Sequence, residues 1–258
     1  MKKKILLLFA VFCLAVSIAG CSSSKDDYCD KDFLSAMSKG LNDRWKDTSG
    51  DDVVPGTDEQ KEAFSKIVSN ELNNIKDYKD KKFEDSKLQE LAIKYINILQ
   101  DQKDALDYVT VNYEKYEDLW DTAYDERSKL IVEINKKYNL DIDKENEDIL
   151  KEMETNSKEV KDKENIENSI SDMIKNAELK LVSSEYGYKD YEVILENKTS
   201  VKFSSFELDV KLKDNDGIIV DTLVDFEDNW EPGTKVKFTF NTDQDFKSYE
   251  FVTSYYTE

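Results

Sequence analysis

Hydrophobic residues recur at steps of three and four from residue 30 to residue 178, and this spacing predicts helices with one buried face. Between Gly56 and Gly187 the chain has no other glycine and no proline. Both residues break helices, so their absence strengthens the prediction. Gly50, Pro55 and Gly56 predict a loop at residues 48–56. Before this loop, helical steps connect Phe33, Leu34, Met37, Leu41, Arg44 and Trp45. After it, one apolar stripe consists of Phe64, Ile67, Val68, Leu72, Ile75 and Tyr78.

Short capping sequences predict where several helices begin. Thr57 and Gln60 have the spacing of a capping box, in which each side chain satisfies a free amide at the helix start. Ser86 and Gln89 repeat this spacing and predict the start of the next helix. A turn is expected at Asn139–Asp143, with Asp141 or Asp143 capping the helix that follows.

The longest periodic signal covers residues 88–134 and keeps one heptad phase throughout. Only Gln102 and Arg127 interrupt its apolar character. The stripe predicts a bundle or a coiled coil. The β-branched residues and Asn112 in Val109–Asn112 leave two alternatives open: one continuous helix, or a hairpin of two helices. The stripe consists of Leu88, Ala92, Tyr95, Leu99, Gln102, Leu106, Val109, Tyr113, Tyr116, Trp120, Ala123, Arg127, Leu130 and Ile134.

Helical spacing continues to Ala177, but its apolar face is thin in the middle. Between Met153 and Ile166 only Val160 is strongly apolar. We therefore expect this stretch to be exposed or frayed.

At about Leu179 the period changes from helical to alternating. Turn-forming sequences at Asn197–Lys198, Asp214–Gly217 and Glu231–Gly233 separate the alternating runs. We expect Trp230 and the tyrosines near the end to close the core. The three clearest runs are Tyr191, Val193 and Leu195; Phe206, Leu208, Val210 and Leu212; and Val236, Phe238 and Phe240.

These patterns predict an α+β protein of two domains. Residues 30–178 would form an antiparallel helical bundle or coiled-coil hairpin. Residues 179–258 would form an antiparallel β-sandwich.

The β region resembles the FxLYD-type module, an immunoglobulin-like β-sandwich of lipoproteins from Gram-positive bacteria. The resemblance is carried by the segments 193–199, 210–217 and 232–233. Leu212 and Asp214 match the leucine and aspartate of the signature, whereas Val210 and Lys213 replace its aromatic positions. The layout as a whole is similar to Firmicutes surface lipoproteins with a helical middle and this module at the end. The resemblance implies a fold and an envelope location, and it implies no catalytic activity.

The first residues resemble a bacterial lipoprotein signal. Lys2–Lys4 precede an apolar run, and Ile18-Ala19-Gly20-Cys21 ends it. A membrane-spanning helix is the alternative, but the fifteen residues from Ile5 to Ala19 fall short of the roughly 20 that it needs. The resemblance implies cleavage between Gly20 and Cys21 and lipid attachment at Cys21. Residues 1–20 would be the signal peptide, and residues 21–29 a lipidated flexible tether on the extracellular side of the cell membrane.

The net charge limits the possible partners, and the cysteine content limits the possible disulfides. The formal net charge is −20, and a surface this acidic repels nucleic acid and anionic lipid. With Cys13 in the signal and Cys21 lipidated, Cys29 is the remaining thiol, so the mature chain could form no internal disulfide.

The residue content also limits the chemistry. The sequence contains no histidine, which excludes histidine-dependent nucleophilic sites and histidine-ligated zinc. Carboxylates are numerous, but no spacing singles out an acid pair for glycoside hydrolysis. Asp214–Gly217 lacks the spacing of an EF-hand and is better explained as a hairpin turn. Tyr113, Tyr116, Trp120 and Tyr124 could stack on a sugar or peptide, but their heptad positions favour burial in the core.

The sequence therefore favours a non-enzymatic interaction module of the cell envelope, without cofactor or metal. Its partners would be the membrane, through Cys21, and an envelope protein that the sequence does not identify. The alternative is a lipoprotein that binds a sugar, a peptide or a cation and presents it to a membrane partner. No pattern in the sequence indicates an oligomeric state.

Overall fold

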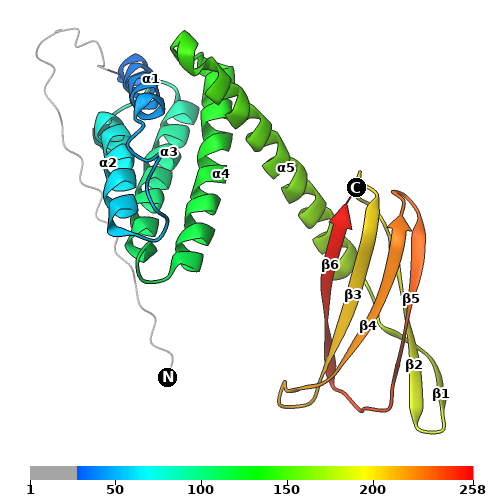
Figure 1. Ribbon diagram of the computed structural model, residues 1–258. Coiled ribbons are helices and arrows are strands. Elements are labelled where there is room, and N and C mark those ends of the chain that lie inside the picture. The colour runs from blue at the N-terminus through cyan, green and yellow to red at the C-terminus, as the bar shows by residue number, and fades with distance from the viewer. Residues whose placement is uncertain (1–27, 258) are drawn as a thin grey trace, which may run out of the picture.

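The computed structural model describes residues 28–257, in which five α-helices precede two antiparallel three-stranded sheets (Figure 1). The α+β class is thus confirmed. The helices are α1 (Asp30–Lys46), α2 (Asp58–Ile75), α3 (Ser86–Ala105), α4 (Tyr113–Tyr138) and α5 (Glu147–Lys175), with the 3₁₀ turns η1 (Lys76–Asp80), η2 (Leu106–Tyr108) and η3 (Lys144–Asn146). The strands are β1 (Lys180–Glu185), β2 (Tyr188–Glu196), β3 (Phe203–Lys213), β4 (Ile219–Trp230), β5 (Lys235–Thr242) and β6 (Ser248–Thr257).

The predicted helix starts are close to the observed ones but differ in their caps. Thr57 Oγ1 accepts the Gln60 amide at 3.3 Å, as expected, whereas Gln60 Oε1 accepts the Gly56 amide at 2.8 Å instead of the Thr57 amide. At α3 the cap is Asp85 and not Ser86. Asp85 Oδ1 accepts the amides of Lys87 and Leu88 at 2.8 and 3.1 Å, because a carboxylate offers a better acceptor to these groups than a hydroxyl.

The chain reverses at residues 106–112, so the hairpin alternative holds and a single continuous helix does not. The helix α3 ends at Ala105, and Asn112 Oδ1 accepts the Lys115 amide at 3.2 Å to start α4. The heptad stripe is therefore divided between two neighbouring helices that pack on each other.

Neither Asp141 nor Asp143 caps α5, which corrects the prediction. The residue before α5 is Asn146, and its side chain makes no capping bond. Asp143 instead pairs with Lys46 of α1 at 2.7 Å, and its amide donates to Asn42 Oδ1 at 2.9 Å. These contacts hold the α4–α5 connection against α1.

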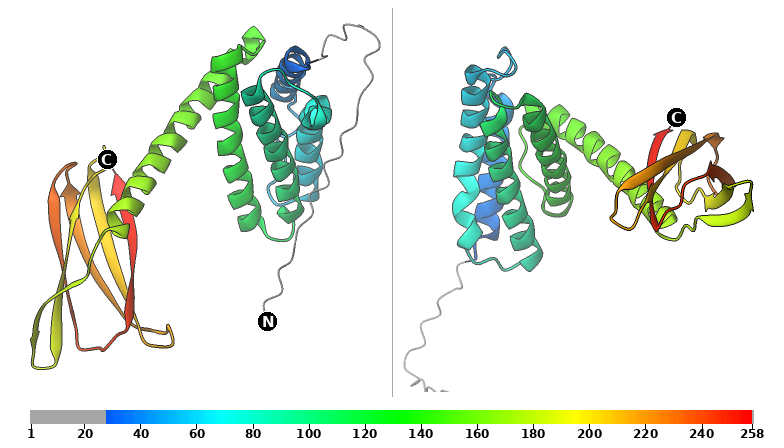
Figure 2. Two further views of the ribbon diagram at one scale, coloured as in Figure 1. Left: turned by 180° about the vertical axis from the view of Figure 1, so that it is seen from behind. Right: turned by 90° about the horizontal axis from the view of Figure 1, so that it is seen from below.

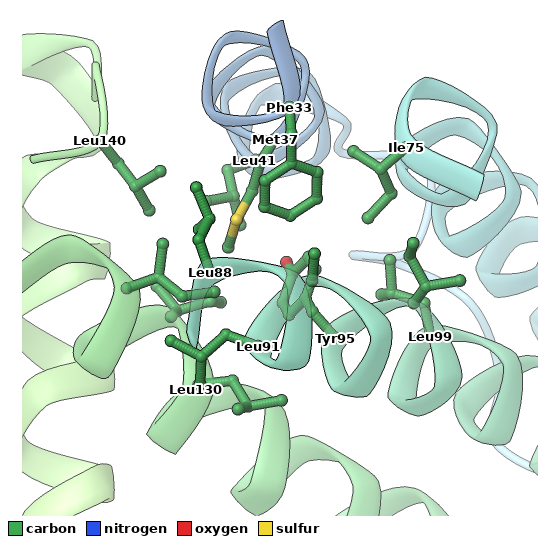
Figure 3. Close-up of a cluster of buried hydrophobic side chains, with 14 of the residues drawn as sticks. Phe33, Met37, Leu41, Ile75, Leu88, Leu91, Tyr95, Leu99, Leu130 and Leu140 are labelled. Carbon is green, nitrogen blue, oxygen red and sulfur yellow. The ribbon is translucent and has the colours of Figure 1, made fainter. Parts of the chain in front are cut away.

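A continuous apolar core joins α1 to α4 (Figure 3). Each of these helices contributes its predicted apolar face, and Met153 adds a contact from α5. The labelled members are Phe33, Met37, Leu41, Ile75, Leu88, Leu91, Tyr95, Leu99, Leu130 and Leu140.

The helix α5 connects the helical part to the sheets (Figure 2). Near its start, Met153 and Ser157 are buried against the bundle. Near its end, Ile170 and Met173 belong to the core of the sheets. Residues 158–165 between these contacts are exposed except for the half-buried Val160, as the thin apolar face predicted.

The sheets have the orders β1-β2-β5 and β4-β3-β6, and they share one core. The three predicted runs are inward-facing parts of β2, β3 and β5. The pattern did not reveal β4, because its inward positions include Asp221 and Asp225. Asp221 Oδ2 accepts the Thr242 hydroxyl at 2.7 Å, and Asp225 Oδ2 accepts the Thr239 amide at 2.8 Å, so both acids bond to β5.

Trp230 provides a test of the β core. Its side chain is 1% exposed and packs against Phe203, Phe206 and Phe238. We expect Trp230→Ala to destabilise this part by about 3–5 kcal/mol, because it removes a large buried ring and leaves a cavity. Urea unfolding followed by circular dichroism would measure the loss. The matched control is Tyr186→Ala, since Tyr186 is 99% exposed, and equal midpoints for the two variants would contradict the assignment of Trp230 to the core.

Candidate functional site

The predicted lipidation site, Gly20 and Cys21, lies outside the described residues. Cys29 lies inside them, at the N-terminal end of α1, and its side chain is buried. Burial, followed by the charge of Asp30, raises the pKa of this thiol. A buried thiol with a raised pKa is poorly suited to nucleophilic chemistry.

The most unusual feature of the bundle is a carboxylate in its interior. Glu71 of α2 is 1% exposed, and both of its oxygens accept from Arg127 Nη2, at 2.9 and 3.0 Å. Arg44 Nη1 donates to Glu71 Oε2 at 2.7 Å, and the Tyr95 hydroxyl donates to Oε1. Arg44 Nη1 also donates to Gln102 Oε1 at 3.1 Å. We call these five residues the Glu71 cluster.

The Glu71 cluster explains the two interruptions of the heptad stripe. Gln102 and Arg127 keep the stripe's inward direction and are 0% and 1% exposed, so they are buried polar positions and not surface positions. The backbone of α1 comes close enough at Gly40 that a Cβ there would lie 3.4 Å from Glu71 Cγ. The cluster thus joins α1, α2, α3 and α4 at one level.

Electrostatics favour the charged form of Glu71. Burial alone would raise its pKa, but the charges of Arg127 and Arg44 and the Tyr95 hydrogen bond outweigh burial and hold the pKa below its usual value. Burial also raises the pKa of Tyr95 well above its usual value, so the hydroxyl remains a donor. Within the described residues, two buried donors of the cluster, Gln102 Nε2 and Arg127 Nε, have no hydrogen-bond partner. The remaining bonds of the cluster tie four helices together, which favours a structural role.

A groove between α3 and α4 is the best candidate for binding. Its volume is about 550 Å³, within the range of small-molecule sites. The small side chains of Ala105 and Ala123 leave space at its floor, and Ile98 and Leu119 add apolar surface. Its acidic rim consists of Asp101, Asp104 and Glu126, and at one end Lys115 Nζ lies 3.8 Å from the centre of the Tyr108 ring.

The groove and the Glu71 cluster lie on the same helices. Asp101 and Glu126 on the rim directly precede Gln102 and Arg127 in the sequence. Bonds from Gln102 and Arg127 toward the interior therefore help to fix the two helices whose outer sides form the groove.

The aromatic stripe packs as the sequence predicted. Tyr116 is buried, and its ring centre lies 5.4 Å from that of Tyr113 and 5.7 Å from that of Trp120. Trp120 also contacts Phe64 of α2 edge to face at 5.2 Å. Tyr124 is partly buried against the main core. Tyr116 thus belongs to a small apolar core, against which Tyr113 and Trp120 are partly buried.

The Asp214–Gly217 segment is a hairpin turn between β3 and β4, as expected. Asp214 Oδ1 accepts the amides of Asp216 and Ile218, both at 2.9 Å, and Gly217 has a φ of +80°. Asp214 Oδ1 is thus occupied by the turn itself. Among residues 28–257, no group of three or more Cys, Asp or Glu side chains has the arrangement of a metal site.

Comparison with protein-family models, with curated proteins and with solved structures finds no match for this chain. Within the described residues, none of the helices has the length and apolar character needed to cross a bilayer.

The Glu71 cluster gives a pH-dependent prediction. Because the folded-state pKa of Glu71 lies below its ordinary value of 4.5, its stabilisation is complete above that pH and is lost as the pH falls through the folded-state pKa. Glu71→Gln should cost about 3–5 kcal/mol at pH 7, since it leaves buried guanidinium groups unpaired, and it should weaken the loss of stability in acid. Urea unfolding at pH 7 and at lower pH would measure both effects.

The matched control is Glu90→Gln, which removes an exposed carboxylate of α3 that pairs with Lys94. We expect its unfolding midpoint to stay close to that of the unmodified protein. Similar losses for the two variants would contradict the structural role of the Glu71 cluster.

Proposed function

We propose that the protein is a membrane-anchored extracytoplasmic lipoprotein that acts as a non-enzymatic interaction module at the cell envelope. The observation that carries this proposal is a set of large apolar side chains exposed on the outer strands of the sheets. Val224 and Phe226 of β4 are 54% and 61% exposed, and Tyr256 of β6 is 74% exposed. Apolar side chains gathered on one sheet face are typical of interaction surfaces.

The β region supports an immunoglobulin-like module of the FxLYD type as part of this proposal. Two antiparallel sheets share its core, and Leu212 is buried in β3. Asp214 directly follows β3 and organises the turn to β4 through two backbone amides. Both residues that match the signature thus have structural roles in the β3–β4 hairpin.

The groove between α3 and α4 favours a second candidate, a lipoprotein that binds a ligand for a membrane partner. An apolar floor with an acidic rim suits a cationic or amphipathic small molecule or peptide. Such a ligand would stabilise the protein saturably, by about 2.7 kcal/mol at a hundredfold excess over Kd. Ala123→Leu would fill the floor and remove this effect.

The anchoring proposal predicts the behaviour of Cys21→Ala. Without the thiol no thioether can form, so we expect uncleaved precursor and complete loss of lipid labelling in cells. Metabolic labelling with a fatty-acid probe and the mobility of the protein on a gel would measure both. The matched control is Cys29→Ala, which should keep the label, and labelling that persists in Cys21→Ala would contradict the proposal.

The interaction proposal predicts position-dependent crosslinking in living cells. A photo-crosslinking side chain at position 226 of the full chain should give a discrete protein adduct, because this position would face the partner. The same side chain at position 186 is the control, since Tyr186 is an exposed aromatic at the β1–β2 turn. Identical adduct patterns at the two positions, or a specific turnover by the purified protein, would contradict the proposal.

A further inference from the structure

The register of the β4-β3-β6 sheet places nine outward-facing residues in three rows. Each row has one residue from each strand, because β3 pairs with β4 on one side and with β6 on the other. We call this surface the outer grid. Its rows are Asp228, Ser205 and Tyr256; Phe226, Glu207 and Ser254; and Val224, Asp209 and Val252.

The outer grid is open to solvent although α5 packs nearby. The groove between α5 and the sheet is lined by Phe251, Thr253 and Tyr255, which alternate with the grid residues of β6 and point to the other face. A bond from Ser254 Oγ to Glu207 Oε1 at 3.4 Å confirms that the grid residues of neighbouring strands share one face. Among the apolar members of the grid, Val224, Phe226 and Tyr256 are exposed, and Val252 is half-buried.

Charge on the outer grid has one sign. Glu207, Asp209 and Asp228 are its members with charged side chains, and it contains no lysine or arginine. The first base, Lys211, lies one row further along β3, and Lys213 beyond it already pairs with Glu250.

Asp209 is the clearest sign that the outer grid lacks a partner. It lies between Val224 and Val252, and its Oδ1 is shielded from solvent without a hydrogen bond in the described part of the chain. Leaving a shielded carboxylate oxygen without a donor costs free energy. Asp209 as a whole is only half-buried, so a rotation of its side chain would present this oxygen to an incoming donor with apolar flanks.

We propose that the outer grid binds an extended, arginine-containing segment of another envelope protein. The guanidinium group bonds Asp209 and Glu207 and stacks on Phe226, and apolar residues beside the arginine cover Val224 and Val252. Arginine suits this surface better than lysine, because its planar group can pair with a carboxylate and stack on a ring at once. This inference rests on the proposed interaction function and names the surface and the chemistry of the partner.

The other occupants of an apolar sheet face fit less well. A second copy of this chain would bring its own net charge of −20 against three acids, and anionic lipid would be repelled in the same way. A cationic protein segment gains from the charge that disfavours both.

The test is calorimetric titration of the purified full chain, in non-ionic detergent, with a short synthetic peptide of alternating arginine and valine. We expect saturable binding at one site, weaker binding of the lysine–valine peptide, and none of the glutamate–valine peptide. Asp209→Asn should weaken binding about tenfold or more, because it replaces a charge-assisted bond by a neutral one while keeping the shape of the side chain. Phe226→Ser, at an exposed position, should weaken binding as well.

The matched control is Asp243→Asn, which removes the same charge from an exposed residue between β5 and β6, outside the outer grid. We expect it to bind the arginine peptide as the unmodified protein does. Absence of saturable binding, or equal weakening by Asp209→Asn and Asp243→Asn, would overturn the inference. If position 226 still gave a discrete crosslinked adduct, the interaction function would stand and the proposed partner chemistry alone would fail.

Discussion

The carboxylate of Glu71 is the group on which the helical part depends, because it needs donors from three other helices. Arg44 of α1, Tyr95 of α3 and Arg127 of α4 each reach it from a different side. A buried charge is costly when any of its partners is missing, so an arrangement that separates one of these helices loses more than apolar contact. Apolar packing alone tolerates sliding of one helix along another, whereas this set of bonds exists in one register. We infer that the Glu71 cluster selects the arrangement of the four helices more than it adds to their total stability.

The groove follows from that constraint. The bundle core and the Glu71 cluster hold α3 and α4 from inside, and the small side chains of Ala105 and Ala123 leave a depression on the other side. Two of its three rim acids, Asp101 and Glu126, are next to Gln102 and Arg127 in the sequence. Because α3 and α4 are held in place by contacts on their inner sides, the groove needs little reorganisation to receive a ligand. This lowers the entropic cost of binding.

The sequence predicted much of the secondary structure and only part of the site. Helical spacing revealed the apolar faces of the bundle, and the two interruptions at Gln102 and Arg127 were visible as interruptions. The sequence did not show why these two positions are polar, because the cluster that they belong to is centred on Glu71 of another helix. A signal for Glu71 did exist: it lies four residues after Ile67 and four before Ile75, on the apolar face of α2. A charged residue in a buried stripe indicates a partner, but only tertiary structure identifies which one. The groove had no such signal, since local patterns do not tell which helix pair leaves a gap.

In β4, too, the sequence did not show which tertiary partners its acidic residues have. For this reason it did not predict the candidate interaction surface. In an alternating strand, apolar residues are expected to face inward and polar residues outward. In β4, however, the acids Asp221 and Asp225 face inward and accept hydrogen bonds from β5. The apolar residues Val224 and Phe226 consequently face solvent. An acid on an inner face is stable here because β5 supplies a hydroxyl and an amide at hydrogen-bond distance, so no penalty forces the reverse arrangement. The outward apolar side chains of Val224 and Phe226 have no contacts within the described residues that would offset their exposure to water. The inverted pattern of β4 therefore stabilises the junction of the two sheets with one face and leaves the other face available for a partner.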